Sequence, residues 1–299
     1  MSAAAHDWIA VDWGTTRLRA WGMAGGAPVW EADSGAGMGA LAPEGFEPAL
    51  LELIGARLHG RTLVLACGMV GARQGWVEAP YAAVPCAPAA APIRAPARDA
   101  RLDVRILPGL SQAAPPDVMR GEETQIAGLI ARAPRWDGVA CLPGTHTKWA
   151  EISAGEVVSF RTAMSGELHA LLSERSVLRH STQGAAPAPG EAFLGAVADA
   201  MGRPEALAAR LFGLRAEGLL EGTGAGALAA RLSGLLIGAE LAAMRPYWLG
   251  RDVRIVGAGP LAALYAAALD AQGVRAQTED AAAVTLAGLA AARAALEDA

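Results

Sequence analysis

Two stretches of the sequence decide the fold: VDWGTTRLRAW at residues 11–21 and LPGTHTKWAEI at residues 142–152. In each, a predicted strand enters a Gly-Thr turn, a second strand leaves it, and a third follows after Gly25-Gly26 or Ala154-Gly155. Placing Gly14 over Gly144 aligns the two units at an offset of 130 residues. Chance matches four residues easily but seldom repeats the order of three strands, so the sequence favours an internal duplication over coincidence.

Further strands and helices extend both units. A stretch rich in Pro and Ala between residues 79 and 100 has no helical or strand period, which predicts a long surface segment. Apolar periodicity and β-branched residues mark the other elements. We expect strands at 8–11, 17–23, 29–32, 62–66, 104–107, 139–142, 148–152, 157–160 and 253–256, and helices at 43–59, from 120 onward, 190–201, 204–211, 225–244, 261–272 and 281–297.

Composition narrows the class of protein. The chain has 299 residues, 53% of them hydrophobic and 18% charged, which is typical of a compact protein of about two domains. The net charge is −5 and the arginines are scattered, so a nucleic-acid partner is not expected. No signal peptide, long apolar run or short cysteine couplet stands out, which predicts a cytoplasmic protein without a membrane partner and leaves homo-oligomerisation open.

The two Gly-Thr turns suit the binding of phosphate groups. Glycine lets the backbone approach closely, and backbone N–H groups and threonine hydroxyls donate hydrogen bonds to anionic oxygens. Asp12 ends the first strand, where a hard carboxylate oxygen can bind Mg²⁺. Lys148 is the only lysine in the chain and directly follows the second turn. A single turn of this kind is usually an ordinary hairpin, but the repeated pair favours binding of a triphosphate.

Phosphoryl transfer to a hydroxyl also benefits from a carboxylate that accepts its proton. Glu122 and Glu123 are adjacent candidates where a helix is expected to begin. The alternative is structural, because acidic residues in a first helical turn are stabilised by the helix dipole.

Three further segments are candidates for ligand contacts. IVGAGP at residues 255–260 joins a strand to a helix through a glycine turn, which suits a nucleotide-lining loop or simple tight packing. Arg73-Gln74 and Arg161-Thr162 lie in predicted loops, where an arginine can bind a carboxylate through two parallel N–H···O hydrogen bonds. Each arginine can equally be a surface ion-pair partner.

The chain as a whole resembles the 2-dehydro-3-deoxygalactonokinase family. The resemblance rests on eight strings that occur in order along nearly the whole chain: VDWGTTRLRAW, ACGMVGARQGWVEAPY, PGLSQ, DVMRGEETQI, LPGTHTKW, FRTAMSGEL, LSGLLIGAEL and IVGAGPLAALY. It implies an α/β fold of two ribonuclease-H-like lobes, as in actin-like ATPases, with mixed sheets flanked by helices and a central cleft. We expect the lobes to span residues 1–133 and 134–299.

The resemblance also implies a chemistry and a set of residues. The expected activity is ATP- and Mg²⁺-dependent phosphorylation of the 6-hydroxyl of 2-dehydro-3-deoxy-D-galactonate in galactonate or galactose breakdown. Glu123 is then the expected base, with Glu122 in reserve, and Arg73 or Arg161 would orient the acid. The expected nucleotide-binding residues are Asp12, Gly14, Thr15, Thr16 and Arg17 in the first phosphate motif, Gly144, Thr145, His146, Thr147 and Lys148 in the second, and Gly257, Ala258, Gly259 and Pro260 beside the adenosine.

Two alternatives remain at this point. A glutamate at the place of the base also resembles exopolyphosphatases, where it positions water, so a phosphohydrolase of the same fold stays open. A nucleotide-gated regulator with little catalysis is the other alternative, although no DNA-binding appendage stands out in the sequence.

Overall fold

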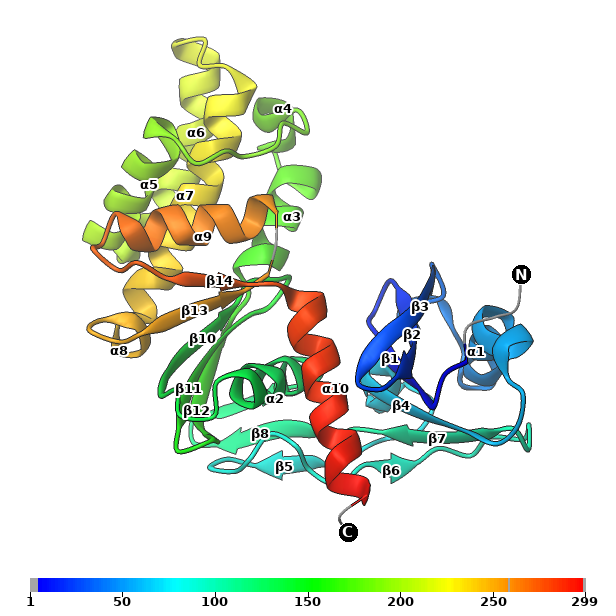
Figure 1. Ribbon diagram of the computed structural model, residues 1–299. Coiled ribbons are helices and arrows are strands. Elements are labelled where there is room, and N and C mark those ends of the chain that lie inside the picture. Colours follow the sequence, from blue (N-terminus) through cyan, green and yellow to red (C-terminus); the bar gives the residue numbers. More distant parts are fainter. Residues whose placement is uncertain (1–4, 258, 298–299) are drawn as a thin grey trace. The chain divides into compact units, whose positions relative to one another are not determined.

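The computed structural model describes residues 5–257 and 259–297. Within them the chain forms two compact units: residues 5–136, 154–158 and 282–297 make the first, and residues 137–153 and 159–281 make the second. The last helix therefore groups with the first unit, whereas the sequence placed it with the second half. Figure 1 shows the elements of both units.

The first unit is built on a mixed sheet with the strand order β3-β2-β1-β4-β7-β6. Strand β1 pairs antiparallel with β2 and parallel with β4, and β4 pairs parallel with β7. β1 is central and buried, which explains its continuous apolar run. The strands are β1 Trp8–Trp13, β2 Leu18–Ala24, β3 Ala27–Ser34, β4 Thr62–Gly68, β6 Ile93–Arg94 and β7 Leu102–Ile106.

The second unit repeats this arrangement. Its sheet has the order β12-β11-β10-β13-β14, with β10 antiparallel to β11 and parallel to β13, as β1 is to β2 and β4. The shared order agrees with the duplication inferred from the two Gly-Thr turns, and the predicted α/β fold is confirmed. The strands are β10 Gly138–Leu142, β11 Thr147–Ser153, β12 Glu156–Ala163, β13 Val253–Val256 and β14 Gln277–Glu279.

Helices cover the sheet of the second unit, and α5 and α6 pack along α7 (Figure 1). Helix α7 is apolar and long enough to cross a membrane, but 67% of its apolar window is buried within the unit, so its composition is explained by its place in the core. Gly234 and Gly238 allow this close packing, since a Cβ on either would overlap carbonyl oxygens of α5. The helices are α3 Ser165–Arg175, α4 Arg179–Thr182, α5 Glu191–Gly202, α6 Leu207–Leu220, α7 Ala225–Ala243, α8 Arg245–Trp248 and α9 Pro260–Asp270.

Two helices of the first unit cross at a pair of glycines. A Cβ on Gly288 in α10 (Ala281–Glu297) would overlap the carbonyl oxygen of Thr124 in α2 (Glu122–Arg132), and a Cβ on Gly128 would overlap that of Val284. On the other side of the unit, α1 (Phe46–Ile54) lies between short 3₁₀ turns, so the helix predicted at 43–59 is present but interrupted.

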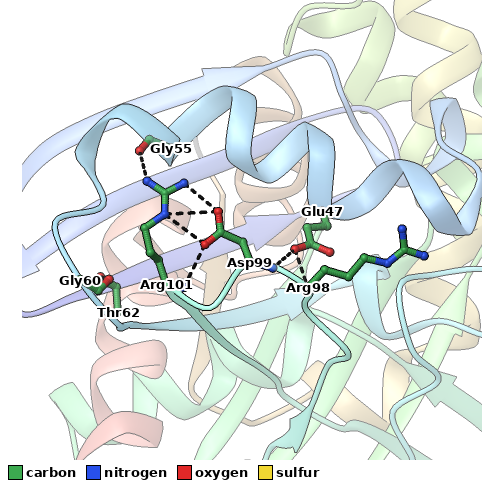
Figure 2. A network of polar contacts seen from close by, with 7 residues as sticks. All are labelled: Glu47, Gly55, Gly60, Thr62, Arg98, Asp99 and Arg101. Carbon is green, nitrogen blue, oxygen red and sulfur yellow. Dashed lines mark hydrogen bonds and ion pairs between the residues drawn. The ribbon is translucent and has the colours of Figure 1, made fainter.

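The segment at 79–100 contains short strands, so its expected lack of structure was wrong in part. β5 (Tyr81–Ala83) joins β8 (Gly109–Ala113) and β9 (Pro116–Met119) in a small third sheet. The end of the segment is tied to α1, because Glu47 accepts hydrogen bonds from the backbone N–H groups of Arg98 and Asp99 at 2.8 and 2.7 Å (Figure 2). These strands were missed because they are short and paired through tertiary contacts rather than marked by an apolar period.

Candidate active site

A cavity of about 180 Å³ lies in the first unit, where the ends of β1 and β4 meet the beginning of α2. Three residues predicted from the sequence, Asp12, Gly14 and Glu122, line its wall. The other lining residues are Cys67, Gly68, Met69, Arg120, Gly121, Gln125 and Thr285. The cavity therefore brings the predicted metal ligand and one predicted acid-base residue together.

Asp12 is held at the cavity by its neighbouring strand. It lies opposite Arg19 in the β1–β2 register, and the Arg19 guanidinium donates a hydrogen bond to its Oδ2. The Cys67 Sγ lies 4.0 Å from the other carboxylate oxygen. The sequence pointed to Arg17 as the basic residue of this motif and missed Arg19. The signal was the cross-strand pairing itself, since Asp12 and Arg19 are directly opposed in a hairpin with a four-residue turn.

Glu123 is the most perturbed carboxyl group near the cavity. The residue is 1% exposed, and its Oε2 accepts a 2.6 Å hydrogen bond from the backbone N–H of Gly121. Burial, followed by the negative charge of Glu122, raises the pKa of Glu123 to about 8, against the opposing effect of that hydrogen bond. The position in the first helical turn favours a negative charge, but here the loss of water outweighs it.

The Cys67 thiol is affected by the charges of both Asp12 and Glu123. Burial raises the pKa of this thiol well above the usual range, and the negative charges of Asp12 and Glu123 raise it further. The Cys67 thiol therefore stays neutral and is a small buried group beside Asp12.

Glu122 differs from Glu123 in exposure. It is half-buried and lines the cavity, and its Oε2 accepts a hydrogen bond from the backbone N–H of Arg120 at 3.1 Å. The Gly121 between Arg120 and Glu122 has φ +105°, a conformation that favours glycine. This turn lets both glutamates fold back onto the backbone N–H groups that precede the helix.

The Gly14 turn presents its threonines to solvent. The Gly14 N–H donates to the Arg17 carbonyl at 2.9 Å, while the N–H groups of Met38 and Gly39 donate to the carbonyls of Gly14 and Thr15. Thr15, Thr16 and Arg17 are exposed. Arg17 pairs with Asp33 at 3.1 Å, so it binds the adjacent strand rather than Asp12.

The Gly144 turn in the second unit is anchored to α3. The Glu167 N–H donates to the Thr145 carbonyl at 2.9 Å, and the His146 Nε2 lies 2.6 Å from the Glu167 carboxylate. Thr145 and His146 are exposed, whereas Thr147 and Lys148 are buried at 0% and 5% exposure. Thr147 and Lys148 are adjacent on β11, so their side chains point to opposite faces of the sheet.

The hydroxyl of Thr147 leads into a buried polar network. It lies 2.8 Å from the Tyr265 hydroxyl, which donates to Glu240 at 2.9 Å, and Glu240 also accepts from Trp149 at 2.7 Å. A small cavity of about 30 Å³ beside it is lined by Gly144, Ser165 and Tyr265, among others. Sequence reasoning missed Glu240 and Tyr265, although an acidic residue within the apolar string LSGLLIGAEL was a signal.

Of the residues predicted to lie beside the adenosine, those within the described part of the chain line neither of the two cavities above. Gly259, with φ +79°, precedes Pro260 at the start of α9, and the Gly257 N–H donates to the Glu279 carbonyl at 3.0 Å. Ala258 lies outside the described residues.

The two predicted substrate pairs lie at exposed positions. Arg73 is 81% exposed in its side chain and lies 3.6 Å from Glu78, with Gln74 exposed beside it. Arg161 is exposed and Thr162 half-buried near the end of β12. Neither pair lines the cavity that contains Asp12.

Within residues 5–257 and 259–297, no group of three or more His, Cys, Asp or Glu side chains could hold a metal ion. Asp12 fits the other way in which proteins bind Mg²⁺, through one or two carboxylates together with substrate phosphates and water. Its partly exposed carboxylate at the cavity wall is suited to that arrangement.

A family model described as 2-keto-3-deoxy-galactonokinase matches residues 12–292 of the sequence. The chain belongs to this family. It is 41% identical over 295 residues to a Rhizobium meliloti protein named probable 2-dehydro-3-deoxygalactonokinase, covering 95% of this chain and 96% of that protein. It is 37% identical over 273 residues to the 2-dehydro-3-deoxygalactonokinase of Escherichia coli, covering 89% and 90%.

One solved structure agrees with membership of the 2-keto-3-deoxy-galactonokinase family, and a more distant one shares the fold. The crystal structure of a Sinorhizobium meliloti protein described as a putative 2-dehydro-3-deoxygalactonokinase superimposes with a TM-score of 0.91 at 39% identity. The match covers 97% of this chain and 99% of the other. The activator of a 2-hydroxyisocaproyl-CoA dehydratase from Clostridium difficile has a TM-score of 0.50 at 13% identity, covering 98% and 97%, and shares the fold alone. The chain is thus a kinase-family enzyme, and membership of such a family implies use of a nucleotide.

Proposed function

We propose that this chain transfers the γ-phosphoryl group of ATP to the 6-hydroxyl of 2-dehydro-3-deoxy-D-galactonate, as a step of galactonate or galactose breakdown in the cytoplasm. Membership of the 2-keto-3-deoxy-galactonokinase family supports this substrate. One structural observation carries the chemistry: Glu123, a carboxyl group with a pKa of about 8, directly follows Glu122, which lines the same cavity as Asp12. A base with a pKa near the working pH is well suited to accept a proton.

Glu123 is the proposed base, and its burial supports the assignment. A desolvated carboxylate binds a proton more strongly than an exposed one, so it can take the proton that the 6-hydroxyl loses as the new P–O bond forms. Glu122 is the alternative base, because it lines the cavity and Glu123 does not. Comparison of Glu122→Gln with Glu123→Gln decides which of the two residues is the base.

The phosphates are proposed to bind at the two Gly-Thr turns. Exposed Thr15 and Thr16 in the first turn, and Thr145 and His146 in the second, offer hydrogen-bond donors. Lys148 would neutralise phosphate charge, and Mg²⁺, when bound at Asp12, would supply further charge neutralisation. Gly257, Gly259 and Pro260 are proposed to lie beside the adenosine.

The carboxylate of the sugar acid is proposed to bind Arg73 or Arg161. Both guanidinium groups are exposed, and the 3.6 Å contact between Arg73 and Glu78 is long enough to be exchanged for a bidentate pair with a ligand. Gln74 and Thr162 would add neutral hydrogen bonds.

A panel assay tests the proposal. Pure protein is incubated with ATP, Mg²⁺ and a series of aldonates, hexoses and 2-keto-3-deoxy acids while ADP is followed. ADP formation that depends on 2-dehydro-3-deoxygalactonate is the expected result. Phosphate release without any sugar would instead indicate a phosphohydrolase, and nucleotide binding without turnover on any member of the panel would indicate a regulator.

A further inference from the structure

A chain of hydrogen bonds links the second Gly-Thr turn to a buried carboxylate in the core of its unit. It runs from the Gly144 N–H to the Thr147 hydroxyl at 3.5 Å, on to the Tyr265 hydroxyl at 2.8 Å, and on to Glu240 at 2.9 Å. The residues Thr147, Tyr265 and Glu240 are 0%, 1% and 5% exposed. The links therefore compete with little water, and each strengthens the others.

The direction of the chain follows from counting protons. Tyr265 has one hydroxyl proton, which it donates to the Glu240 carboxylate. In the contact between the two hydroxyls, Thr147 must then be the donor, which leaves its oxygen to accept from the Gly144 N–H. All donors thus point from the turn toward Glu240.

Glu240 is built into this unit as an acceptor. Its second oxygen accepts from Trp149 at 2.7 Å, and Ser165 at the start of α3 is a third donor. Burial raises the pKa of Glu240, and the hydrogen bonds from Ser165, Trp149 and Tyr265 oppose that effect. Thr147 and Trp149 are two residues apart on β11, so both reach Glu240's side of the sheet, while Lys148 points to the other face.

The kinase chemistry proposed above has no reacting group at Glu240. Burying its carboxyl group on an apolar helix costs free energy, which the hydrogen bonds from Trp149 and Tyr265 offset. We propose that Glu240 is a positioning residue that fixes the Gly144 turn for binding ATP, through Tyr265 and Thr147. It touches no reactant. The Glu240 carboxylate accepts the last hydrogen bond and so fixes the direction in which each hydroxyl donates. These hydrogen bonds in turn fix the conformation of the Gly144 turn. The inference rests on the proposed function only in taking ATP as the ligand of the turn.

Three substitutions interrupt the chain at different links. Thr147→Val and Tyr265→Phe each delete one hydroxyl at nearly constant shape. Glu240→Gln replaces an acceptor of three hydrogen bonds by an amide whose N–H group faces other donors. Each variant should weaken binding of MgATP about tenfold, as expected for one or two lost hydrogen bonds. Binding of the sugar acid should not change.

Thr182→Val is the matched control, because it deletes a buried hydroxyl of the same unit whose hydrogen bond is local: it donates at 3.2 Å to the carbonyl of Leu178, the residue that precedes α4. It should lower Tm as much as Thr147→Val but leave MgATP affinity unchanged. A second readout is coupling: the Glu240→Gln/Thr147→Val double variant should bind MgATP no more weakly than the weaker single variant.

Calorimetric titration with MgATP measures both readouts without turnover. Unchanged affinity in Thr147→Val and Tyr265→Phe, or additive losses in the double variant, would overturn the inference, as would a wild-type protein that binds no MgATP. If wild type binds MgATP and the variants weaken it while no sugar acid is phosphorylated, the proposed function fails and the positioning role stands.

Discussion

The two Gly-Thr turns occupy the same place in two sheets that share the order of five strands, yet they are surrounded by different chemistry. The first turn follows Asp12, which contacts Arg19 and Cys67 and lines a cavity together with Glu122 at the beginning of α2. The second is backed by a network of hydroxyl and aromatic groups that ends on Glu240. A duplicated frame has thus kept its backbone and diverged in its side chains.

This difference suggests a division of labour. Carboxylates near the first turn suit proton transfer and Mg²⁺ binding, and the first unit holds Glu123, whose pKa is raised to about 8. Lys148 and the hydrogen-bond chain behind the second turn suit the holding of phosphates. We therefore expect variants near the first turn to affect mainly kcat and metal dependence. Variants near the second turn should affect mainly nucleotide affinity.

The largest effect is expected for Glu123→Gln. Loss of the base should lower kcat by about 10²- to 10⁴-fold while leaving the affinity for ATP unchanged. Steady-state kinetics with the sugar acid, together with ATP titration, measures both. Glu122→Gln is the matched control, and near-normal turnover of Glu123→Gln with a collapse in Glu122→Gln would transfer the role to Glu122.

The pH profile of the wild-type enzyme sharpens the same point. A base must be deprotonated to act, and burial holds the pKa of Glu123 at about 8. We therefore expect kcat/KM to rise about tenfold per pH unit below that value and to level off above it. A profile that is flat from pH 6 to pH 9 would contradict the assignment.

Lys148→Met tests the second turn. Removing the only lysine of the chain should raise KM for ATP and lower kcat/KM for ATP by about hundredfold. Lys148→Arg should restore little, because a planar guanidinium does not replace a compact ammonium in a buried position. A variant with normal nucleotide kinetics would show that the second turn does not depend on this charge.

Asp12→Asn should act mainly through the metal. A neutral amide binds Mg²⁺ more weakly than a carboxylate, so about tenfold more Mg²⁺ should be needed for half-maximal activity. Titration of activity with Mg²⁺ at fixed ATP measures the change, with Asp33→Asn as the control, since Asp33 pairs with Arg17 on the surface. Equal Mg²⁺ requirements in both variants would remove Asp12 as the ligand.

The smallest effect is a stability difference that depends on pH. The pKa of Glu123 is about 8 in the folded protein, whereas a glutamate in the unfolded chain loses its proton near its ordinary pKa of 4.5. Stability contributed by the neutral acid is therefore present at low pH and lost as pH rises through 8. Glu123→Gln should melt several degrees above wild type at pH 9 and close to it at pH 5. Equal melting curves at both values would contradict the raised pKa.

Local patterns predicted the frame of the molecule well. The two hairpins, β13 and the last helix follow from turn residues and apolar periodicity, and the structure confirms each of them. Both Gly-Thr turns were visible because they depend on a few adjacent residues.

Other features depend on contacts between residues far apart in the sequence. Helix α10 joins the first unit through the Gly128–Gly288 crossing, which no local pattern reveals. β8 and β9 were missed because pairing with strands, rather than an apolar period, stabilises them. The helix α3 was missed because Ser165 is its only buried residue, so it has no apolar stripe. In the same way Arg19 and Glu240 acquire their partners only once strands and helices are packed.

The most direct test of the account is ³¹P NMR of a reaction with ATP, Mg²⁺ and 2-dehydro-3-deoxy-D-galactonate. The account predicts equal amounts of ADP and a phosphomonoester whose phosphorus couples to the two protons at C6, with no such product from the 6-deoxy analogue. Inorganic phosphate in place of the ester, or an ester at another carbon, would contradict it.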